Sequence, residues 1–306
     1  MGAEQRNLAG SILQTDNGSY WYCCGNWNPE GVSDSLPAIL AYTPDTGKYP
    51  KIEGQKVLEF GKYRFLKAFG TPFQVYRDHY LPEMGNVIDA TTLGRVAFVS
   101  RQHIADIRDP HSFTAKFLEK LPEVREKLRR LTQFLDLELE DLGITGSSLM
   151  MPEPTLRQET DLGIYGSDKS RKAYRILEDA RSRGEIKRWV DRYYLPFEFE
   201  GTAFDPQFSY GHTEAHPFEG VSFGKPVERP NTEVLIGESP DAIFYPAVYT
   251  TQSIRLVTFR PGQRGYFKQG DQVAFESISE VDVKWGNGNT ERVYAVMNDE
   301  TGSVKE

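Results

Sequence analysis

The chain has little cysteine, and this excludes two classes of protein. Its 306 residues include only two cysteines, Cys23 and Cys24, which are adjacent. Adjacent cysteines bridge poorly, and two of them build neither a disulfide framework nor a zinc site with four protein ligands. We therefore expect both to be small apolar residues of a strand, in a protein of the reducing cytoplasm.

Long apolar runs and net positive charge are also missing. No stretch approaches the roughly 20 apolar residues that a membrane helix needs, and the start, MGAEQRNLAG, lacks the basic and apolar regions of a signal peptide. The net charge of -8 argues against broad binding of nucleic acid, although a local basic face remains compatible with it. A soluble protein without a membrane partner is expected.

The sequence divides into three regions that differ in their pattern of apolar and turn residues. Short apolar and aromatic runs separated by Gly, Pro and Asn turns fill residues 1–108 and again residues 223–306, which is typical of β structure. In residues 109–222 helical and strand patterns alternate. These patterns predict an α+β protein with three domains: a β-rich N-terminal domain (1–108), a central mixed α/β domain (109–222), and a C-terminal small β-barrel (223–306).

Two helices are expected in the central part. Apolar residues recur at helical spacing from Val124 to Leu135, with Pro122 in the first turn. A second apolar stripe runs from Ala173 to Ala180. The basic residues around this second helix are expected to form a solvated face, because acidic residues are interspersed among them. The alternative is that some of them neutralise the charge of a bound phosphate group.

Two short segments between these helices carry the chemistry. The second of them, ETDLGIYG at residues 159–166, reads as a strand, so that Glu159 and Asp161 point to one face about 6.5–7 Å apart. Close carboxylates repel unless a cation neutralises them, and Mg²⁺ is commonly held by one or two carboxylates together with substrate phosphates. Gly163 on the same face is expected to leave room for a ligand, while the intervening residues pack on helices.

The first segment, GITGSS, ends in the turn Gly146-Ser147-Ser148, which would open a short helix. A glycine lets the backbone approach a phosphate, and helix-start N–H groups and serine hydroxyls can donate to its oxygens. Alone, such a turn is usually a helix start and such an acid pair a solvated strand edge. Together they offer an anion cradle beside a cation site, as a metal-bound nucleoside triphosphate requires.

The two segments resemble the signature of the nucleotidyltransferase superfamily typified by DNA polymerase beta. That signature joins a hydrophobic residue, Gly, and Gly or Ser to two acids that flank a hydrophobic residue. The resemblance implies that Gly146 and Ser147, next to Ser148, contact the triphosphate, and that Glu159 and Asp161 bind Mg²⁺ or Mn²⁺. The wider layout, with VSRQHIADIRDP before this region and IFYPAVY behind it, is similar to uncharacterised archaeal-type nucleotidyltransferase-domain proteins.

The family also uses a third carboxylate on a later strand, which completes the metal site or accepts a proton from the acceptor hydroxyl. Asp205 lies in the corresponding part of the chain, although a turn residue before Pro206 is equally compatible. Glu198 and Glu200 are rivals, and Glu200 fits a hairpin turn better. The implied reaction moves a nucleoside monophosphate from an NTP to an acceptor hydroxyl, on RNA or a small molecule, and releases pyrophosphate.

Departures from the signature keep other hypotheses open. The first acid is Glu159 and not Asp, Thr160 occupies a usually hydrophobic position, and the insert MMPEP lies between cradle and carboxylates. They motivate a second hypothesis, a catalytically degenerate member of the fold that acts as an RNA- or protein-binding module. A third hypothesis is a structural β protein in which the motif is accidental.

A second possible metal site is disfavoured. His212 and His216 flank Glu214 in GHTEAHP, but their spacing suits ligands only on a helix. Gly211 and Pro217 favour a loop at this position.

Overall fold

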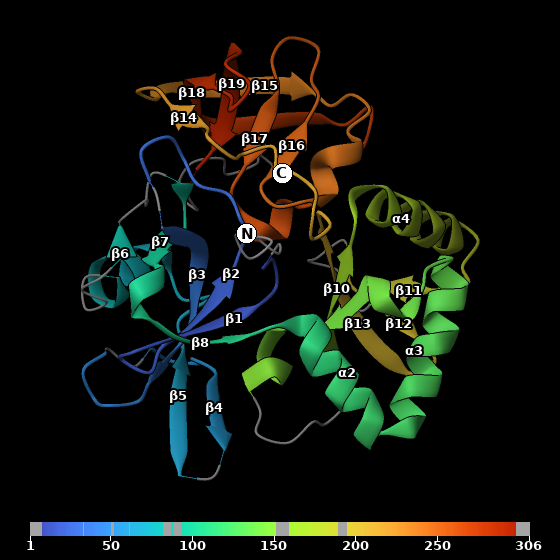
Figure 1. Cartoon of the computed structure of the whole chain (residues 1–306). Coiled ribbons are helices and arrows are strands. Elements are labelled where there is room, and N and C mark those ends of the chain that lie inside the picture. The colour runs from blue at the N-terminus through green and yellow to red at the C-terminus, as the bar shows by residue number, and fades with distance from the viewer. Residues whose placement is uncertain are drawn as a thin grey trace.

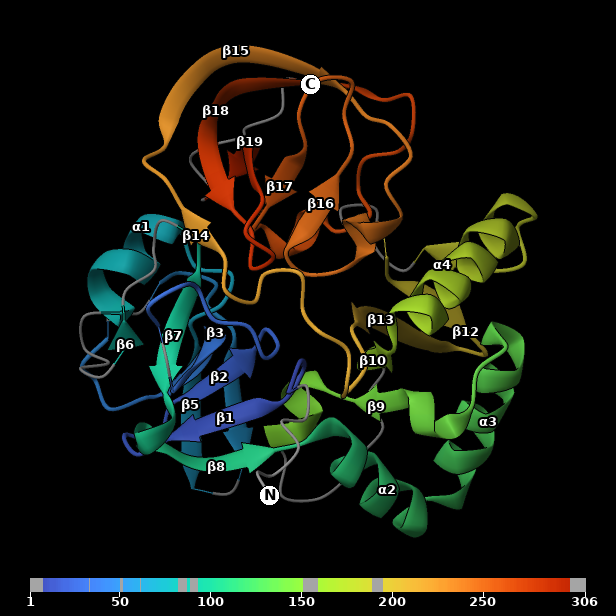
Figure 2. The same cartoon turned by 45° about the horizontal axis from the view of Figure 1, so that its top comes forward.

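The protein is a mixed α/β structure built mainly of strands, which form three sheets (Figure 1; Figure 2). The computed structural model describes residues 8–32, 34–49, 52–60, 62–81, 87–88, 93–150, 159–188 and 195–297. Within those ranges, none of the helices has the length and apolar character needed to cross a bilayer.

The first sheet lies in the N-terminal part, drawn blue to teal in Figure 1, and its described strands are paired antiparallel in the order β4-β5-β3-β2-β1-β8. β7 pairs with β3 and β6 with β7. The strands are β1 (Ile12–Thr15), β2 (Tyr20–Cys23), β3 (Ser35–Pro44), β4 (Val57–Phe60), β5 (Tyr63–Lys67), β6 (Val87–Ile88), β7 (Val96–Ser100) and β8 (Ile104–Arg108). Short helical turns are α1 (Phe73–Val75), η1 (Tyr76–Tyr80) and η4 (Arg101–His103).

The second sheet carries three helices on one face. Its order is β11-β12-β13-β10-β9, and β10 and β13 are parallel. The strands are β9 (Leu142–Ile144), β10 (Glu159–Tyr165), β11 (Lys187–Arg188), β12 (Phe197–Phe199) and β13 (Thr202–Ser209). The helices are α2 (Pro110–Lys120), α3 (Pro122–Leu135) and α4 (Ser167–Ser182), with the short η5 (Leu139–Asp141) and η6 (Gly146–Met150).

Local chemistry explains where these helices begin and which face they bury. Asp109 caps α2 by accepting a hydrogen bond from the Ser112 N–H at 2.8 Å, and Pro110 takes the first helical position, where its missing N–H costs little. In α3 the predicted apolar stripe is buried, and the helix ends at Asp136 in the left-handed conformation. In α4 the buried positions include Ala173 and Ala180. The two predicted helices are confirmed.

The third sheet lies in the C-terminal part, orange to red in Figure 1, and does not close into the predicted small barrel. Its order is β14-β18-β19-β17-β16, with β15 also on β18. Within the described residues, one isolated bridge between Ile236 and Thr251 links the segments that follow β15 and β16, but these two strands do not pair along their length. Closure of a barrel depends on which distant strands pair, and a sequence pattern of short strands and turns does not predict that pairing. The elements are β14 (Ser222–Phe223), β15 (Val227–Leu235), η7 (Pro240–Ile243), β16 (Ala247–Tyr249), β17 (Leu256–Thr258), η8 (Pro261–Gln263), β18 (Gln272–Lys284) and β19 (Thr290–Val296).

The first and third sheets share a hydrophobic core. One buried cluster includes Trp27 and Phe98 from the N-terminal part, Phe218 from the loop after β13, and Val257 and Val293 from the third sheet. The aromatic rings of Trp27 and Phe98 meet edge to face at 5.7 Å. The predicted domain boundaries at 108/109 and 222/223 stay predictions, and β14 spans the second of them.

Candidate functional site

Two of the predicted acids lie side by side on neighbouring strands. β10 and β13 run parallel, with Asp161 in register with Asp205. Side chains in register emerge on the same face of a sheet, and the two strands are about 4.8 Å apart. Both aspartates are half-buried. Strand pairing therefore joins two carboxylates that are far apart in the sequence.

The acidic face is the one turned away from the helices. Leu162, Ile164 and Phe204 belong to the core formed with α2, α3 and α4. Because side chains alternate along a strand, Asp161 and Asp205 emerge on the opposite face, toward the N-terminal part. The predicted division of β10 into a polar and an apolar face is confirmed at these positions.

The third predicted metal ligand is Glu159. It is the first residue of β10 and is in register with Ala203, but its side chain lies outside the described residues. Among the side chains that are described, no group of three or more His, Cys, Asp or Glu is arranged to hold a metal ion. The structure therefore places two of the three predicted carboxylates, and the complete metal site stays a prediction.

The Gly146-Ser147-Ser148 turn sits directly against Asp161. Gly146 has φ +69°, and an ideal β-carbon on it would lie 2.8 Å from Asp161 Cβ and would overlap the carboxylate. The Thr145 N–H donates to the Asp161 carbonyl at 3.0 Å. The predicted short helix follows as η6, in which Ser148 is buried and Ser147 half-buried. The turn and the acid pair are thus one packed unit.

The Gly146 amide has a hydrogen-bond partner inside the turn. Its N–H donates to Thr145 Oγ1 at 2.6 Å. What Gly146 contributes to the turn is the absence of a side chain and the left-handed backbone that only glycine adopts freely. The contacts of Gly146, Ser147 and Ser148 with a phosphate stay predictions.

Tyr22, on β2 of the first sheet, reaches the same site. Its hydroxyl lies 3.2 Å from Thr145 Oγ1 and accepts a hydrogen bond from Gln207 Nε2 at 3.0 Å. Burial raises the pKa of Tyr22 well above its usual range, and the charge of Asp161 raises it further. The sequence did not indicate this residue, because YWYC predicts a strand but not which distant side chains meet it.

The expected room beside Gly163 is filled. An added β-carbon there would lie 2.6 Å from Tyr165 Oη, because the ring of Tyr165 folds back over the glycine. The Tyr165 hydroxyl donates to the Ala9 carbonyl at 3.0 Å, and the rings of His111 and His212 lie 4.3 Å and 5.7 Å from the Tyr165 ring. The glycine therefore accommodates an aromatic ring, and the prediction that it leaves space for a ligand is wrong.

The rivals of Asp205 are less well placed. Glu200 lies in the turn between β12 and β13 with φ 47°, and its carboxylate accepts hydrogen bonds from Arg130 at 2.7–3.0 Å. This is the hairpin-turn role that the sequence predicts for it. Glu198 is exposed on β12, in register with Ala203, so that the whole of β13 separates it from Asp161.

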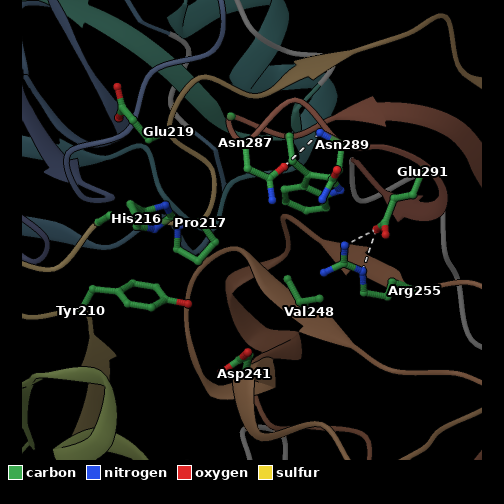
Figure 3. Close-up of a pocket in the computed structure, with 13 residues that line it drawn as sticks. Tyr210, His216, Pro217, Glu219, Asp241, Val248, Arg255, Asn287, Asn289 and Glu291 are labelled. Carbon is green, nitrogen blue, oxygen red and sulfur yellow. Dashed lines mark hydrogen bonds and ion pairs between the residues drawn. The ribbon is translucent and has the colours of Figure 1, made fainter.

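The histidines around Glu214 do not converge, and the loop prediction is confirmed. Glu214 accepts from the Ser167 N–H at 2.9 Å, at the start of α4, and from the Gly211 N–H at 2.8 Å. His216 stacks on Trp27 at 5.7 Å. Its Nδ1 accepts from the Phe218 N–H and its Nε2 lies 3.2 Å from the Tyr245 carbonyl, while burial lowers its pKa to about 3. Figure 3 shows it at the wall of a cavity.

This cavity, of about 570 Å³, lies between the loop that follows β13 and the third sheet (Figure 3). Arg255 lies over the Trp285 ring, 4.6 Å from its centroid, and pairs with Glu291 at 2.5 Å. Glu219 and Asp241 add two further carboxylates to the lining. Asp241 pairs with Arg171 at 2.7 Å, so three carboxylates face two guanidinium groups. This excess of negative charge disfavours a triphosphate, and a nucleotide fits the Gly146 turn better than this cavity.

No protein-family model, curated protein or solved structure matches this chain. Its chemistry is therefore to be inferred from its own residues. Asp161 and Asp205 present carboxylate oxygens, which are the ligands that hard divalent cations prefer. The adjoining turn contains Ser147 and Ser148, and hydroxyl groups are donors of a type suited to phosphate oxygens.

Proposed function

We propose that the chain is a metal-dependent nucleotidyltransferase, which moves a nucleoside monophosphate from an NTP to an acceptor hydroxyl and releases pyrophosphate. One observation carries the proposal: Asp161 is in register with Asp205, and Gly146 of the serine turn packs against the Asp161 carboxylate. A cation site and an anion site are thereby adjacent, as a metal-bound triphosphate requires.

The available residues fit Mg²⁺ or Mn²⁺. Asp161 and Asp205 would hold the ion together with Glu159, and the contact with Gly146 fixes where the Asp161 carboxylate lies relative to the turn. When bound, the ion would neutralise the triphosphate and lower the cost of developing charge on its oxygens. Without an ion, the two aspartates repel each other across the strand pair.

The remaining steps fall to the chain itself. Ser147 and Ser148 would donate to the β and γ phosphates and hold the α-phosphate in line with the acceptor. The acceptor oxygen forms a bond to the α-phosphorus as the bond to the β-phosphate oxygen breaks, and pyrophosphate leaves. Asp205 has two alternative roles: it holds the ion, or it takes the proton of the acceptor hydroxyl and passes it to solvent. Charge neutralisation and positioning supply most of the catalysis in such reactions.

The acceptor is proposed to be RNA or a small molecule, in the cytoplasm. Free Cys23 and Cys24 agree with a reducing compartment. Burial raises the pKa of Cys23 to about 12, so its thiol is not a reactive group.

The test is pyrophosphate release from each of the four NTPs, with Mg²⁺, with Mn²⁺ and with a chelator, in the presence of RNA or candidate small-molecule acceptors. We expect release with at least one NTP and none with the chelator. Binding of NTP is measured in parallel. If no NTP binds, the enzyme proposal fails. If an NTP binds without turnover, the catalytically degenerate binding module is the better description.

A further inference from the structure

We propose that Tyr22 is a positioning residue of the nucleotidyl-transfer site, although it belongs to the first sheet. Its hydroxyl group holds Thr145, and Thr145 in turn holds the amide of Gly146, so that the N-terminal part of the chain sets the orientation of the triphosphate-binding turn. The inference rests on the proposed function and adds to it a residue that no sequence motif contains.

The strand that carries Tyr22 presents it to the site by simple alternation. On β2, Trp21 is fully buried in the core of the first sheet. Tyr22 therefore emerges on the opposite face, where Leu149 and Met150 of η6 pack against the same cluster. This contact brings the segment that follows the serine turn onto the first sheet.

The donors and acceptors around Thr145 assign a direction to each hydrogen bond. The Thr145 hydroxyl has one proton to donate. Its oxygen lies 2.6 Å from the Gly10 carbonyl oxygen, which can only accept. The same oxygen accepts the Gly146 N–H. With its proton committed to Gly10, Thr145 must accept from the Tyr22 hydroxyl at 3.2 Å. Gln207 Nε2 completes the chain by donating to the Tyr22 oxygen at 3.0 Å.

The result is a continuous relay of hydrogen bonds between the N-terminal and the central part of the protein. It runs from Gln207 through Tyr22 and Thr145 to Gly10, with Gly146 attached as a branch. Gln207 lies on β13 two residues after Asp205, on the same face. The relay therefore ties the strand of one proposed metal ligand to the turn that packs on the other.

Removing the Tyr22 hydroxyl tests this assignment. Tyr22→Phe keeps the ring but leaves Thr145 and Gln207 without their shared partner, so the Gly146 peptide is less well oriented. One lost hydrogen bond corresponds to a change of between about twofold and about tenfold. We expect KM for the NTP to rise by this factor in steady-state pyrophosphate release, with a smaller change in kcat.

The matched control is Tyr20→Phe. Tyr20 lies two residues earlier on the same strand and face, where its ring meets Phe65 edge to face at 5.2 Å. Tyr20→Phe also removes one hydroxyl, from a ring in the cluster that contains Leu149 and Met150, and we expect this variant to keep the wild-type KM. Thr145→Val, which has the same shape but no hydroxyl, should raise KM as Tyr22→Phe does, whereas Thr145→Ser should restore most of the wild-type value.

The double variant Tyr22→Phe with Thr145→Val separates a relay from independent damage. Because both substitutions break the same link, their effects on KM should be clearly less than additive. Additive effects, or a Tyr22→Phe enzyme indistinguishable from Tyr20→Phe, would overturn the inference while the proposed function stood. If the wild-type protein neither binds nor turns over NTP, the proposed function fails first and the inference fails with it.

If Tyr22→Phe does not fold, a second variant tests the same relay. Gln207→Leu removes the donor at the other end of the relay and changes no residue of the first sheet. It should raise KM in the same direction as Tyr22→Phe. An unchanged KM in a folded Gln207→Leu protein, as judged by its thermal unfolding curve, would count against the relay as strongly as an unchanged Tyr22→Phe.

Discussion

Gly146 and Asp161 are in direct contact, so that a β-carbon on the glycine would overlap the carboxylate of the aspartate. The proposed phosphate-binding turn and the proposed metal ligand are therefore one unit, and neither can shift without the other. Thr145 reinforces the contact by donating its N–H to the Asp161 carbonyl at 3.0 Å. The predictions that follow test this unit and the contacts that support it.

Gly146→Ala should destabilise the protein and abolish NTP binding. The left-handed backbone alone costs an alanine about 1 kcal/mol, and displacing Asp161 adds to it, so we expect the free energy of unfolding to fall by at least about 2 kcal/mol. Gly184→Ala is the control, because Gly184 has φ +71° with nothing within 4 Å of an added β-carbon. Chemical denaturation of both variants compares them. Equal losses would mean that the contact with Asp161 carries no energy.

Asp161→Asn and Asp205→Asn should each lower kcat for pyrophosphate release by roughly a hundredfold or more, because each removes a charged ligand or the proposed base. Mg²⁺ should raise the melting temperature of the wild type and not of the variants.

Glu198→Gln is the control for these substitutions. It neutralises an acid of the same sheet that is exposed on β12 and separated from Asp161 by β13. We expect it to keep turnover and the melting shift with Mg²⁺. A loss of turnover as large as that of Asp205→Asn would show that the third carboxylate had been assigned to the wrong strand.

Stability should depend on pH through His216. Burial lowers the pKa of His216 from its ordinary 6.5 to about 3, so the unfolded chain binds a proton more readily than the folded one. Stability is therefore lost as the pH falls from 6.5 toward 3, by up to about 1.4 kcal/mol per pH unit. Unfolding free energies measured between pH 7 and 5 should show this slope, and His216→Gln should flatten it.

The range from pH 5 to pH 7 lies above the pH at which Glu126 loses its charge. Hydrogen bonding to Arg129 lowers the pKa of Glu126 from 4.5 to about 2, so its contribution is lost only below pH 4.5. His212→Gln, in the same loop, serves as a control for the loss of a histidine. If His216→Gln keeps the wild-type slope of unfolding free energy against pH, His216 is not the cause of that slope.

Glu214 should stabilise the start of α4. Its carboxylate accepts from the Ser167 N–H at 2.9 Å, close to the positive end of the helix dipole. We expect Glu214→Ala to lower the free energy of unfolding by about 0.5–2 kcal/mol. Asp168→Ala, in the first turn of the same helix, should cost less, because the Asp168 side chain is 98% exposed. Equal losses in thermal denaturation would exclude the capping role.

The order of elements around the site could be predicted from the sequence because it depends on local patterns. Alternation along ETDLGIY separates Asp161 from Leu162 whatever lies around the strand, and helical spacing in α3 does the same for its buried face. Turn chemistry likewise identified Glu200 as a hairpin residue. Each of these depends on neighbours within a few residues.

Long-range pairing decided the rest. The register that joins Asp161 to Asp205, and the open third sheet in place of a barrel, depend on which strands pair. The filled space at Gly163 depends on the rotamer of Tyr165. The contact of Tyr22 with Thr145 depends on how the first sheet packs on the turn. The sequence by itself determined which residues could take part in the site, since residue type sets the chemistry. Only the tertiary structure decided which of them meet, because contacts between distant segments are set by packing.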